Sequence, residues 1–367
     1  MKPTLTLRSS VSSPMASTTL AKTTESPASV SDGGASKSGS RNLPIDTLRG
    51  LACLLLATYH VIGHDAGAGL KVPHGDPLRI FNELLVFARM PLFAFLSGFV
   101  YAWRPYKGNA TEFVGSKIRR LLVPMLLVGT AYALIQINTP GVNTTEVIHW
   151  KLLHVIPVSH YWFLESLFFV FLGIMIVETL GLMSTEAGFL AIFAGAVTLH
   201  LLHPLPIYFG LQGSGYLLPY FLLGVWANRF DGNQRHPWVV PALLVSSAAA
   251  IIYLRLAKQP MPAPFSAYEL LFGATICVTL LRLNLRVGWL AWIGYYSFAI
   301  YLFHSMFSAA TRLALQKVWA APVWFLLLTG VAAAILGPIL LQPWIQRIPI
   351  VGAWILGEKS KRTSSAS

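Results

Sequence analysis

Side chains that can carry a charge or act as nucleophiles recur along one apolar stretch, residues 41–65. They follow one another at steps of three, four, seven and four residues, as Asp46, Arg49, Cys53, His60 and His64. At about 100° per residue, these steps place all five side chains on one stripe of a helix. An ionisable residue inside a membrane span costs a few kcal/mol or more and marks a functional site by default. This stripe is therefore the first candidate for chemistry.

The two ends of this stretch offer different chemistry. His60 suits general-base catalysis near neutral pH, for example on a hydroxyl group. Arg49 lies eleven residues earlier, about 16 Å along a helix, and presents a planar fork of donors to a phosphate or carboxylate. The structural alternative is that Arg49 pairs with Asp46 at the end of the span and that His60 is a hydrogen-bonded interior residue. The sequence favours neither, whereas Cys53 between them is predicted to be a packing residue.

The elements that would position these residues are membrane-spanning helices. Of the 367 residues, 55% are hydrophobic and 11% are charged, against about 25% charged in a soluble protein. The mean hydropathy is +0.61, and several apolar runs approach the ~20 residues with which a helix crosses a bilayer. The sequence therefore predicts an all-α polytopic membrane protein with about ten transmembrane helices, with nine or eleven as the alternatives. The expected spans lie near 45–64, 82–103, 119–138, 161–181, 187–203, 213–229, 238–256, 265–283, 288–311 and 322–345.

The chain is expected to have three parts: a tail at 1–40, a membrane domain at 41–346 and a basic tail at 347–367. The first tail is rich in Ser, Thr, Ala and Gly and lacks the apolar core of a secretory signal peptide. Its composition predicts a disordered cytosolic segment, with a transit peptide as the alternative.

The basic residues predict the orientation in the membrane. With ten spans, about fifteen Lys and Arg residues fall in connections on one face and seven on the other. Because cytosolic connections are enriched in Lys and Arg, we expect both termini in the cytosol. This enrichment also accounts for the net charge of +13, which therefore does not indicate nucleic-acid binding. The two cysteines lie in apolar runs and form no disulfide framework.

Two further basic sites leave alternatives open. Arg89 lies inside the second apolar run and needs a partner, for which Glu83 and Asp65 are candidates. It serves either a function or a structural ion pair. The stretch SKIRRLLVP places three basic residues at the mouth of the third span: Lys117, Arg119 and Arg120. They act either as a stop signal that faces the cytosol or as contacts for an anionic coenzyme.

Two other stretches carry polar side chains into apolar runs. SHYWFLESL places Trp162 at the expected membrane interface and Glu165 inside the span, where it must face the bundle interior. SFAIYLFH places Ser297, Tyr301 and His304 on one stripe, which could instead serve only to hydrogen-bond across helices. No spacing of histidines or cysteines matches a recognised metal site, so we expect no metal.

Taken together, these segments resemble the acyltransferase 3 family of integral-membrane O-acyltransferases. The resemblance rests on five stretches in order, namely IDTLRGLACLLLATYH, MPLFAFLSGF, SKIRRLLVP, HYWFL and SFAIYLFH. It covers residues 41 to about 345. The MPLFAFLSG stretch also looks like the branch of the family that includes fucose 4-O-acetylases.

The resemblance implies transfer of an acyl group, commonly acetyl, from cytosolic acyl-CoA to a hydroxyl of a glycan or lipid-linked sugar. The first-span arginine and histidine that are essential in the family correspond to Arg49 and His60. An Arg-x-x-Arg motif of the family corresponds to Lys117 and Arg120, where the lysine keeps the charge but loses the fork. A bacterial plasma (inner) membrane is the expected location.

The residue patterns and the family resemblance together give each candidate residue an expected role. Catalysis is expected from His60, Arg49 and Asp46. Donor binding is expected from Arg49, Lys117, Arg119 and Arg120. Acceptor binding is expected from Arg89, Glu165, Trp162, Tyr301 and His304. The alternative is a transporter or flippase for a glycan, lipid or small anion, in which the same buried charges line a translocation path.

Overall fold

The computed structural model describes residues 42–142, 148–260 and 262–359, and within these ranges the chain forms helices and no strand. The predicted all-α fold is therefore confirmed. The first helices are α1 (Leu43–Ile62), α2 (Pro77–Leu84), α3 (Val86–Trp103), α4 (Ala110–Lys117), a π-helical turn (Ile118–Leu122), α5 (Val123–Asn138) and α6 (Trp162–Thr179). The later ones are α7 (Glu186–Leu202), α8 (Leu211–Arg229), α9 (Gly232–Arg235), α10 (Val239–Leu256), α11 (Ala267–Leu283), α12 (Gly288–Tyr295), α13 (Ser297–Val318), α14 (Val323–Gln346) and α15 (Val351–Ile355). Short 3₁₀ turns lie at Trp150–Leu152, Ser159–Tyr161 and Tyr208–Gly210. The predicted tail at 1–40 lies outside the described residues.

Seven helical segments of the described ranges are long and apolar enough to cross a bilayer, so the chain is a polytopic membrane protein. They are Leu43–Ile62, Pro77–Trp103, Ala110–Asn138, Ser159–Thr179, Val239–Leu256, Ser297–Val318 and Val323–Gln346. An eighth is added if α11 and α12, which are bent by 119° at their junction, form one broken span. The expected total of about ten is not confirmed.

The span expected near 288–311 is wrong as a single helix. α12 ends at Tyr295 and α13 begins at Ser297, because Tyr296 between them has φ −94° and ψ 11°. No proline marks this break, and the apolar run continues through it. The composition of the segment therefore predicts one continuous helix. The fifth expected span is also short, since α7 has 17 residues.

The ends of α1 are set by local chemistry. The Asn42 side chain accepts a hydrogen bond from the Ile45 backbone N–H at 3.2 Å, and Pro44 follows in the first turn, where no donor is lost. The helix ends at Ile62 because Gly63 has φ +98°, a conformation that favours glycine. His64 therefore lies beyond the helix, and its predicted place on the helical stripe is wrong.

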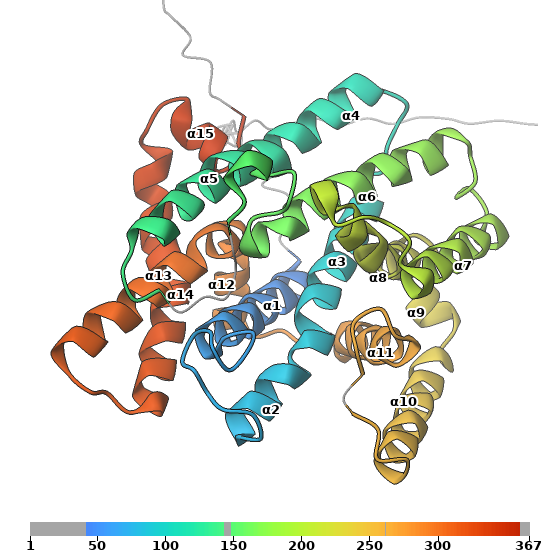
Figure 1. The fold of residues 1–367 in the computed structure, drawn as a ribbon. Helices are drawn as coiled ribbons and strands as arrows, with labels where there is room; N and C mark the ends of the chain where they lie inside the picture. The colour runs from blue at the N-terminus through green and yellow to red at the C-terminus, as the bar shows by residue number, and fades with distance from the viewer. Residues whose placement is uncertain (1–41, 143–147, 261, 360–367) are drawn as a thin grey trace, which may run out of the picture. The chain divides into compact units, whose positions relative to one another are not determined.

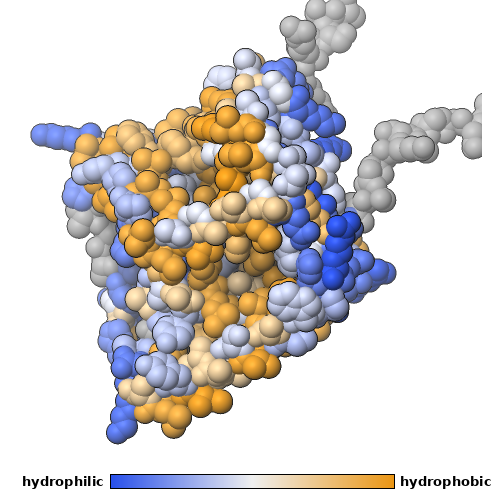
Figure 2. Space-filling model, turned by 90° about the vertical axis from the view of Figure 1, so that its right-hand side faces the viewer, coloured by the Kyte–Doolittle hydropathy of each residue, from blue (hydrophilic) through white to orange (hydrophobic). Residues whose placement is uncertain are grey.

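The described bundle is organised around α1, which packs against α3, α12, α13 and α14 (Figure 1). α3 packs in turn against α8 and α11, and α6 packs against α8. Figure 2 shows hydrophobic residues spread over much of one face and hydrophilic residues gathered towards its edges. This distribution suits a protein whose sides meet lipid and whose ends meet water.

The backbones of α3 and α8 approach so closely that their contact requires glycine. A Cβ at Gly98 would lie 1.9 Å from the Phe221 carbonyl oxygen, and a Cβ at Gly224 would lie 2.0 Å from the Phe95 carbonyl oxygen. Each glycine thus faces the backbone of the other helix, an arrangement typical of membrane helices with small residues at their contact. The contact holds α3, which carries Arg89, against α8.

Replacing Gly98 with Ala is expected to destabilise the protein by about 1–3 kcal/mol or more, because the helices must move apart and lose their packing. Gly173 in α6 is the matched control, since a Cβ there meets nothing within 4 Å. Thermal unfolding of the purified protein in detergent measures both variants. An unfolding midpoint of the Gly98→Ala variant that equals that of Gly173→Ala would contradict the proposed contact.

Candidate active site

Three histidine rings from three segments meet beside the end of α1. The ring centroids of His60 and His304 lie 4.9 Å apart, those of His160 and His304 lie 4.7 Å apart, and those of His60 and His160 lie 5.4 Å apart. His60 comes from α1, His160 from the turn before α6, and His304 from α13. The Nε2 atoms of all three rings are buried and have no hydrogen-bond partner among the described residues. We call these residues the histidine cluster.

The histidine cluster is held by hydrogen bonds between α13 and the turn at Ser159–Tyr161. The Tyr301 hydroxyl donates to the His160 carbonyl, and the Tyr161 hydroxyl donates to the Leu302 carbonyl at 2.7 Å. Nδ1 of His304 lies 2.9 Å from the Ile300 carbonyl oxygen. Because a carbonyl only accepts, Nδ1 carries a proton, and a neutral His304 ring then has its lone pair on Nε2.

Arg89 contacts Tyr59, whose ring centroid lies 5.3 Å from that of His60, and does not form the predicted ion pair. Its guanidinium carbon is 3.4 Å from the centroid of the Tyr59 ring, a cation–π contact. Among the described residues it forms no ion pair with Glu83 or Asp65. The proposal of those partners is therefore wrong, because α1 offers an aromatic face instead of a carboxylate. Tyr59 was not a predicted site residue.

A cavity of about 650 Å³ lies on the side of the histidine cluster nearer the start of α1. Its polar lining includes residues from α1, α3, α13, the π-helical turn and the end of the described chain, namely Arg49, Ser97, Arg120, Ser297, Tyr301 and Lys359. Arg49 also donates to Asp46 Oδ1 at 3.2 Å, so the structural pairing and the cavity lining coexist. Tyr301, expected on the acceptor side, borders this cavity with Arg49. We call it the Arg49 cavity.

Only one of the three basic residues Lys117, Arg119 and Arg120 lines the Arg49 cavity. The π-helical turn after α4 inserts one extra residue into the helix, a feature frequent at functional sites. Arg120 lines the Arg49 cavity, whereas Lys117 does not and lies 3.5 Å from the centroid of the Phe171 ring. Arg119 is also absent from the cavity lining, and its buried Nε has no partner. The structure thus brings Arg120 alone of the three together with Arg49.

A smaller cavity of about 90 Å³ lies on the other side of the histidine cluster and is lined by His60 itself. Its other polar side chains are His64, Tyr132, Ser159, Ser305, Ser308 and Arg312. Sequence reasoning did not single out the three from α13, although Ser305, Ser308 and Arg312 recur at helical spacing. We call this the His60 cavity.

A buried arginine shapes the loop that lines the His60 cavity. Arg79 is 1% exposed and donates to the carbonyl oxygens of Gly63 at 2.5 Å, Asp65 at 2.7 Å and Val72 at 3.1 Å. Asn82 also donates to the Gly63 carbonyl, at 2.7 Å. Charged donors on neutral acceptors make strong hydrogen bonds, so Arg79 fixes the chain directly after α1. Sequence reasoning missed this role because carbonyl partners leave no pattern in side-chain types.

Glu165 and Trp162 lie apart from both of these cavities. Glu165 is 2% exposed and neither carboxylate oxygen has a hydrogen-bond partner, so its predicted interior position is confirmed. Trp162 lines a third, mainly apolar cavity of about 290 Å³ together with Arg89 and Tyr216.

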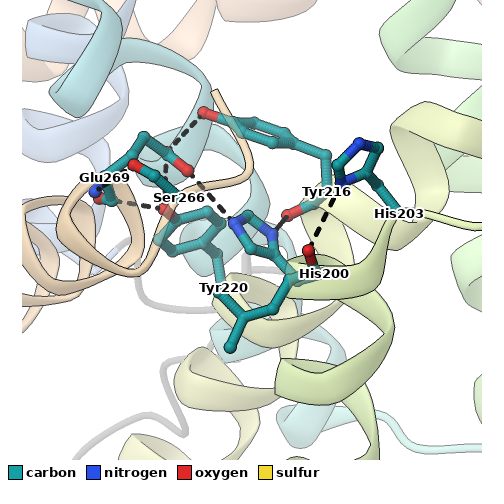
Figure 3. Close-up of polar contacts among 7 residues, drawn as sticks. His200, His203, Tyr216, Tyr220, Ser266 and Glu269 are labelled. Carbon is teal, nitrogen blue, oxygen red and sulfur yellow. Dashed lines mark hydrogen bonds and ion pairs between the residues drawn. The ribbon is translucent and has the colours of Figure 1, made fainter. Parts of the chain in front are cut away.

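A buried carboxylate network braces the neighbouring helices α7, α8 and α11 (Figure 3). Glu269 accepts hydrogen bonds from the hydroxyls of Tyr216 at 2.8 Å and Tyr220 at 2.7 Å, and its other oxygen lies 3.1 Å from Nε2 of His200. Nδ1 of His200 faces the Tyr216 carbonyl at 3.2 Å. Both ring nitrogens of His200 and both carboxylate oxygens of Glu269 thus have partners within this network. Glu269 was not predicted, because its partners come from other helices.

The histidines do not form a metal centre in the described part of the chain. No group of three His, Cys, Asp or Glu side chains there is placed to hold a metal ion. In the connection before α6, His154 bonds the Thr130 hydroxyl at 2.8 Å, and burial holds the pKa of His154 below its usual value. Acid–base chemistry and hydrogen bonding are what these histidines can supply.

The arrangement provides a basic cavity, a histidine cluster and a hydroxyl-lined cavity in succession along α1 and α13. A family model described as an acyltransferase domain, from the acyltransferase 3 family, matches residues 42–342. No curated protein and no solved structure matches the chain. The family match covers most of the membrane bundle, the histidine cluster, the His60 cavity and the lining of the Arg49 cavity other than residues 356–359. The chain therefore belongs to the acyltransferase 3 family and is a membrane acyltransferase.

Proposed function

We propose that this protein transfers an acyl group, acetyl, from cytosolic acyl-CoA to a hydroxyl of a glycan or lipid-linked sugar. The observation that carries the proposal is the succession of two cavities with the histidine cluster between them. Along α1, Arg49 lines the first cavity and His60 the second. Along α13, Ser297 and Tyr301 line the first, and Ser305 and Arg312 the second.

The Arg49 cavity supports the proposed donor. Its volume of about 650 Å³ is in the range of cavities that bind cofactors, roughly 300–1,000 Å³. Arg49, Arg120 and Lys359 bring three positive charges against the single carboxylate of Glu358, and this net positive lining suits the phosphates of coenzyme A. The flexible arm of acyl-CoA would carry the thioester from Arg49 towards His60, about 16 Å further along α1.

The histidine cluster supports base catalysis of the transfer. In the proposed step, the acceptor oxygen attacks the thioester carbonyl carbon while Nε2 of His60 takes the hydroxyl proton. The carbon–sulfur bond then breaks, and the coenzyme A thiolate receives that proton. Arg89, which lies close to the cluster, would stabilise the negative charge that develops on the carbonyl oxygen.

The distribution of Lys and Arg supports the proposed orientation. Arg49 and Arg120 belong to the face with more basic residues, so the donor cavity would open to the cytosol of a bacterium and both termini would lie there. The His60 cavity would then receive an acceptor from the outer side of the plasma membrane. The proposed acceptor-side role includes His304, whose ring centroid lies 4.9 Å from that of His60, and Trp162 and Glu165 in α6, directly after the turn that carries His160.

Labelled acetyl-CoA tests the proposal directly. The purified protein in lipid nanodiscs is expected to transfer the label to glycan or lipid-linked sugar extracted from cells that lack the gene. Mass spectrometry of surface glycans from cells with and without the gene then identifies the acetylated unit. Movement of unmodified sugar across proteoliposomes, without acetyl-CoA and without transfer of label, would support the transporter alternative and contradict the proposal.

A further inference from the structure

Arg312 is a buried cation without an acidic partner in the described part of the chain. It lies in α13 and is 8% exposed. Its guanidinium donates to Gln316 Oε1 at 3.1 Å and to the Gly141 carbonyl oxygen at 3.2 Å, both neutral acceptors. No carboxylate of the described residues forms an ion pair with it. No acidic side chain of the described residues therefore compensates this positive charge.

This charge borders the cavity in which His60 lies. Burial of a charge without an opposite charge is costly, and an uncompensated cation in a low-dielectric wall attracts an anion more strongly than it would in water. His64, another ionisable side chain of this cavity, pairs with Asp65 at 3.0 Å. Arg312 is thus a cation of the His60 cavity that can bind an anion.

The remaining lining suits a sugar. Ser305 Oγ and His60 Nε2 are buried without a hydrogen-bond partner, and both residues line the cavity with Ser308. These groups can exchange hydrogen bonds with hydroxyls. The volume of about 90 Å³ equals about three waters at ~30 Å³ each, so the cavity takes one edge of a sugar ring.

We propose that the acceptor is an anionic sugar, whose carboxylate or phosphate binds Arg312 while the hydroxyl to be acylated lies at His60. This inference rests on the proposed function, because it defines the acceptor class of the same site. Arg312 sets specificity through the bidentate geometry that guanidinium forms with either anion. It takes no part in proton transfer.

Binding of matched probes tests the inference without acyl transfer. Purified protein in nanodiscs is titrated with glucose, glucuronate and glucose 6-phosphate at equal ionic strength, and the thermal unfolding midpoint gives an apparent Kd for each. At least one anionic sugar is expected to bind about tenfold or more tightly than glucose. The apparent Kd values of glucuronate and glucose 6-phosphate show whether the site binds a carboxylate or a phosphate.

Substitutions test whether Arg312 causes the tighter binding of an anionic sugar. Arg312→Gln is expected to abolish the tenfold preference, and Arg312→Lys to retain part of it. The matched control is Arg255→Gln, which removes an exposed arginine at the end of α10 and should leave the preference unchanged. Equal binding of glucose and both anions, no binding of either anion, or a preference that survives Arg312→Gln would overturn the inference.

Donor chemistry in the same preparations separates this inference from the proposed function. Hydrolysis of acetyl-CoA is measured without any acceptor. An anion preference that depends on Arg312 supports the inference even if acetyl-CoA is not used, in which case the proposed donor is rejected. Acetyl-CoA turnover without any Arg312-dependent preference rejects the inference and leaves the proposed donor in place.

Discussion

Replacing His60 with Ala is expected to reduce acyl transfer by about 10²–10⁴-fold, the contribution of a positioned general base. The Nε2 atom of His60 is buried without a hydrogen-bond partner and its ring lines the cavity proposed for the acceptor. No other residue of the histidine cluster lines that cavity, so neither His160 nor His304 is placed there to act as the base. The measurement is the rate of label transfer from acetyl-CoA by equal amounts of wild-type and variant protein.

The fold should survive this substitution, because His60 makes ring contacts but its Nε2 takes part in no internal hydrogen bond. His203→Ala is the matched control, since His203 is an exposed histidine at the end of α7 that borders neither cavity. Membrane abundance and the thermal unfolding midpoint are measured for both variants. Transfer by His60→Ala at the wild-type rate would remove His60 from the mechanism.

The part of the site that could be predicted from the sequence lies on a single helix. Arg49 and His60 share one helix, so helical periodicity alone relates them. His160 and His304 reach His60 only through tertiary packing, and single-sequence periodicity carries no information about such contacts. His160 nevertheless lies in HYWFL, one of the stretches that carried the family resemblance, so its segment was found without its role.

The basic run shows a second limit of reading by periodicity. Donor binding was expected from Lys117, Arg119 and Arg120 of this run, of which Lys117 and Arg120 correspond to the family motif. The π-helical turn at Ile118–Leu122 adds a residue to one turn, so side chains before and after it no longer follow a period of 3.6. Lys117 consequently faces Phe171, and Arg120 faces the Arg49 cavity. The composition of the sequence identified the basic run, but the backbone geometry determines which of its residues lines the Arg49 cavity.

The number of spans could be predicted only approximately, for a related reason. Hydropathy reports whether a segment is apolar, and it does not report whether the helix continues. The break at Tyr296 lies in apolar sequence, whereas the 119° bend between α11 and α12 lies at a short connection with Asn284 and Arg286, whose composition does not give the angle. The bend brings α12 against α1, where a Cβ at Gly294 would lie 2.0 Å from the Asp46 carbonyl oxygen. Close packing at one glycine thus positions the start of α1, which carries Arg49.

Replacing Arg49 with Ala is expected to raise the KM for acetyl-CoA by roughly 10–100-fold, with a smaller change in kcat. A hydrogen bond to a charged group contributes about 1.5–3 kcal/mol, and each 1.4 kcal/mol corresponds to about tenfold in binding. The Arg49 side chain is 34% exposed, so solvent screening keeps the effect below the upper end of that energy range. Because Arg49 lies about 16 Å from His60 along the helix, it acts on donor binding rather than on proton transfer. Arg49→Lys keeps the charge but not the fork and should fall between the wild type and Arg49→Ala.

Arg104→Ala serves as the control for this prediction, because Arg104 is an exposed arginine at the end of α3 and does not line the Arg49 cavity. Initial rates at varied acetyl-CoA concentration separate KM from kcat for each variant. A loss confined to kcat, with KM unchanged, would place Arg49 in the chemical step and contradict its role in holding the donor. An equal rise of KM in Arg104→Ala would show that the basic surface as a whole, rather than the fork of Arg49, attracts the coenzyme.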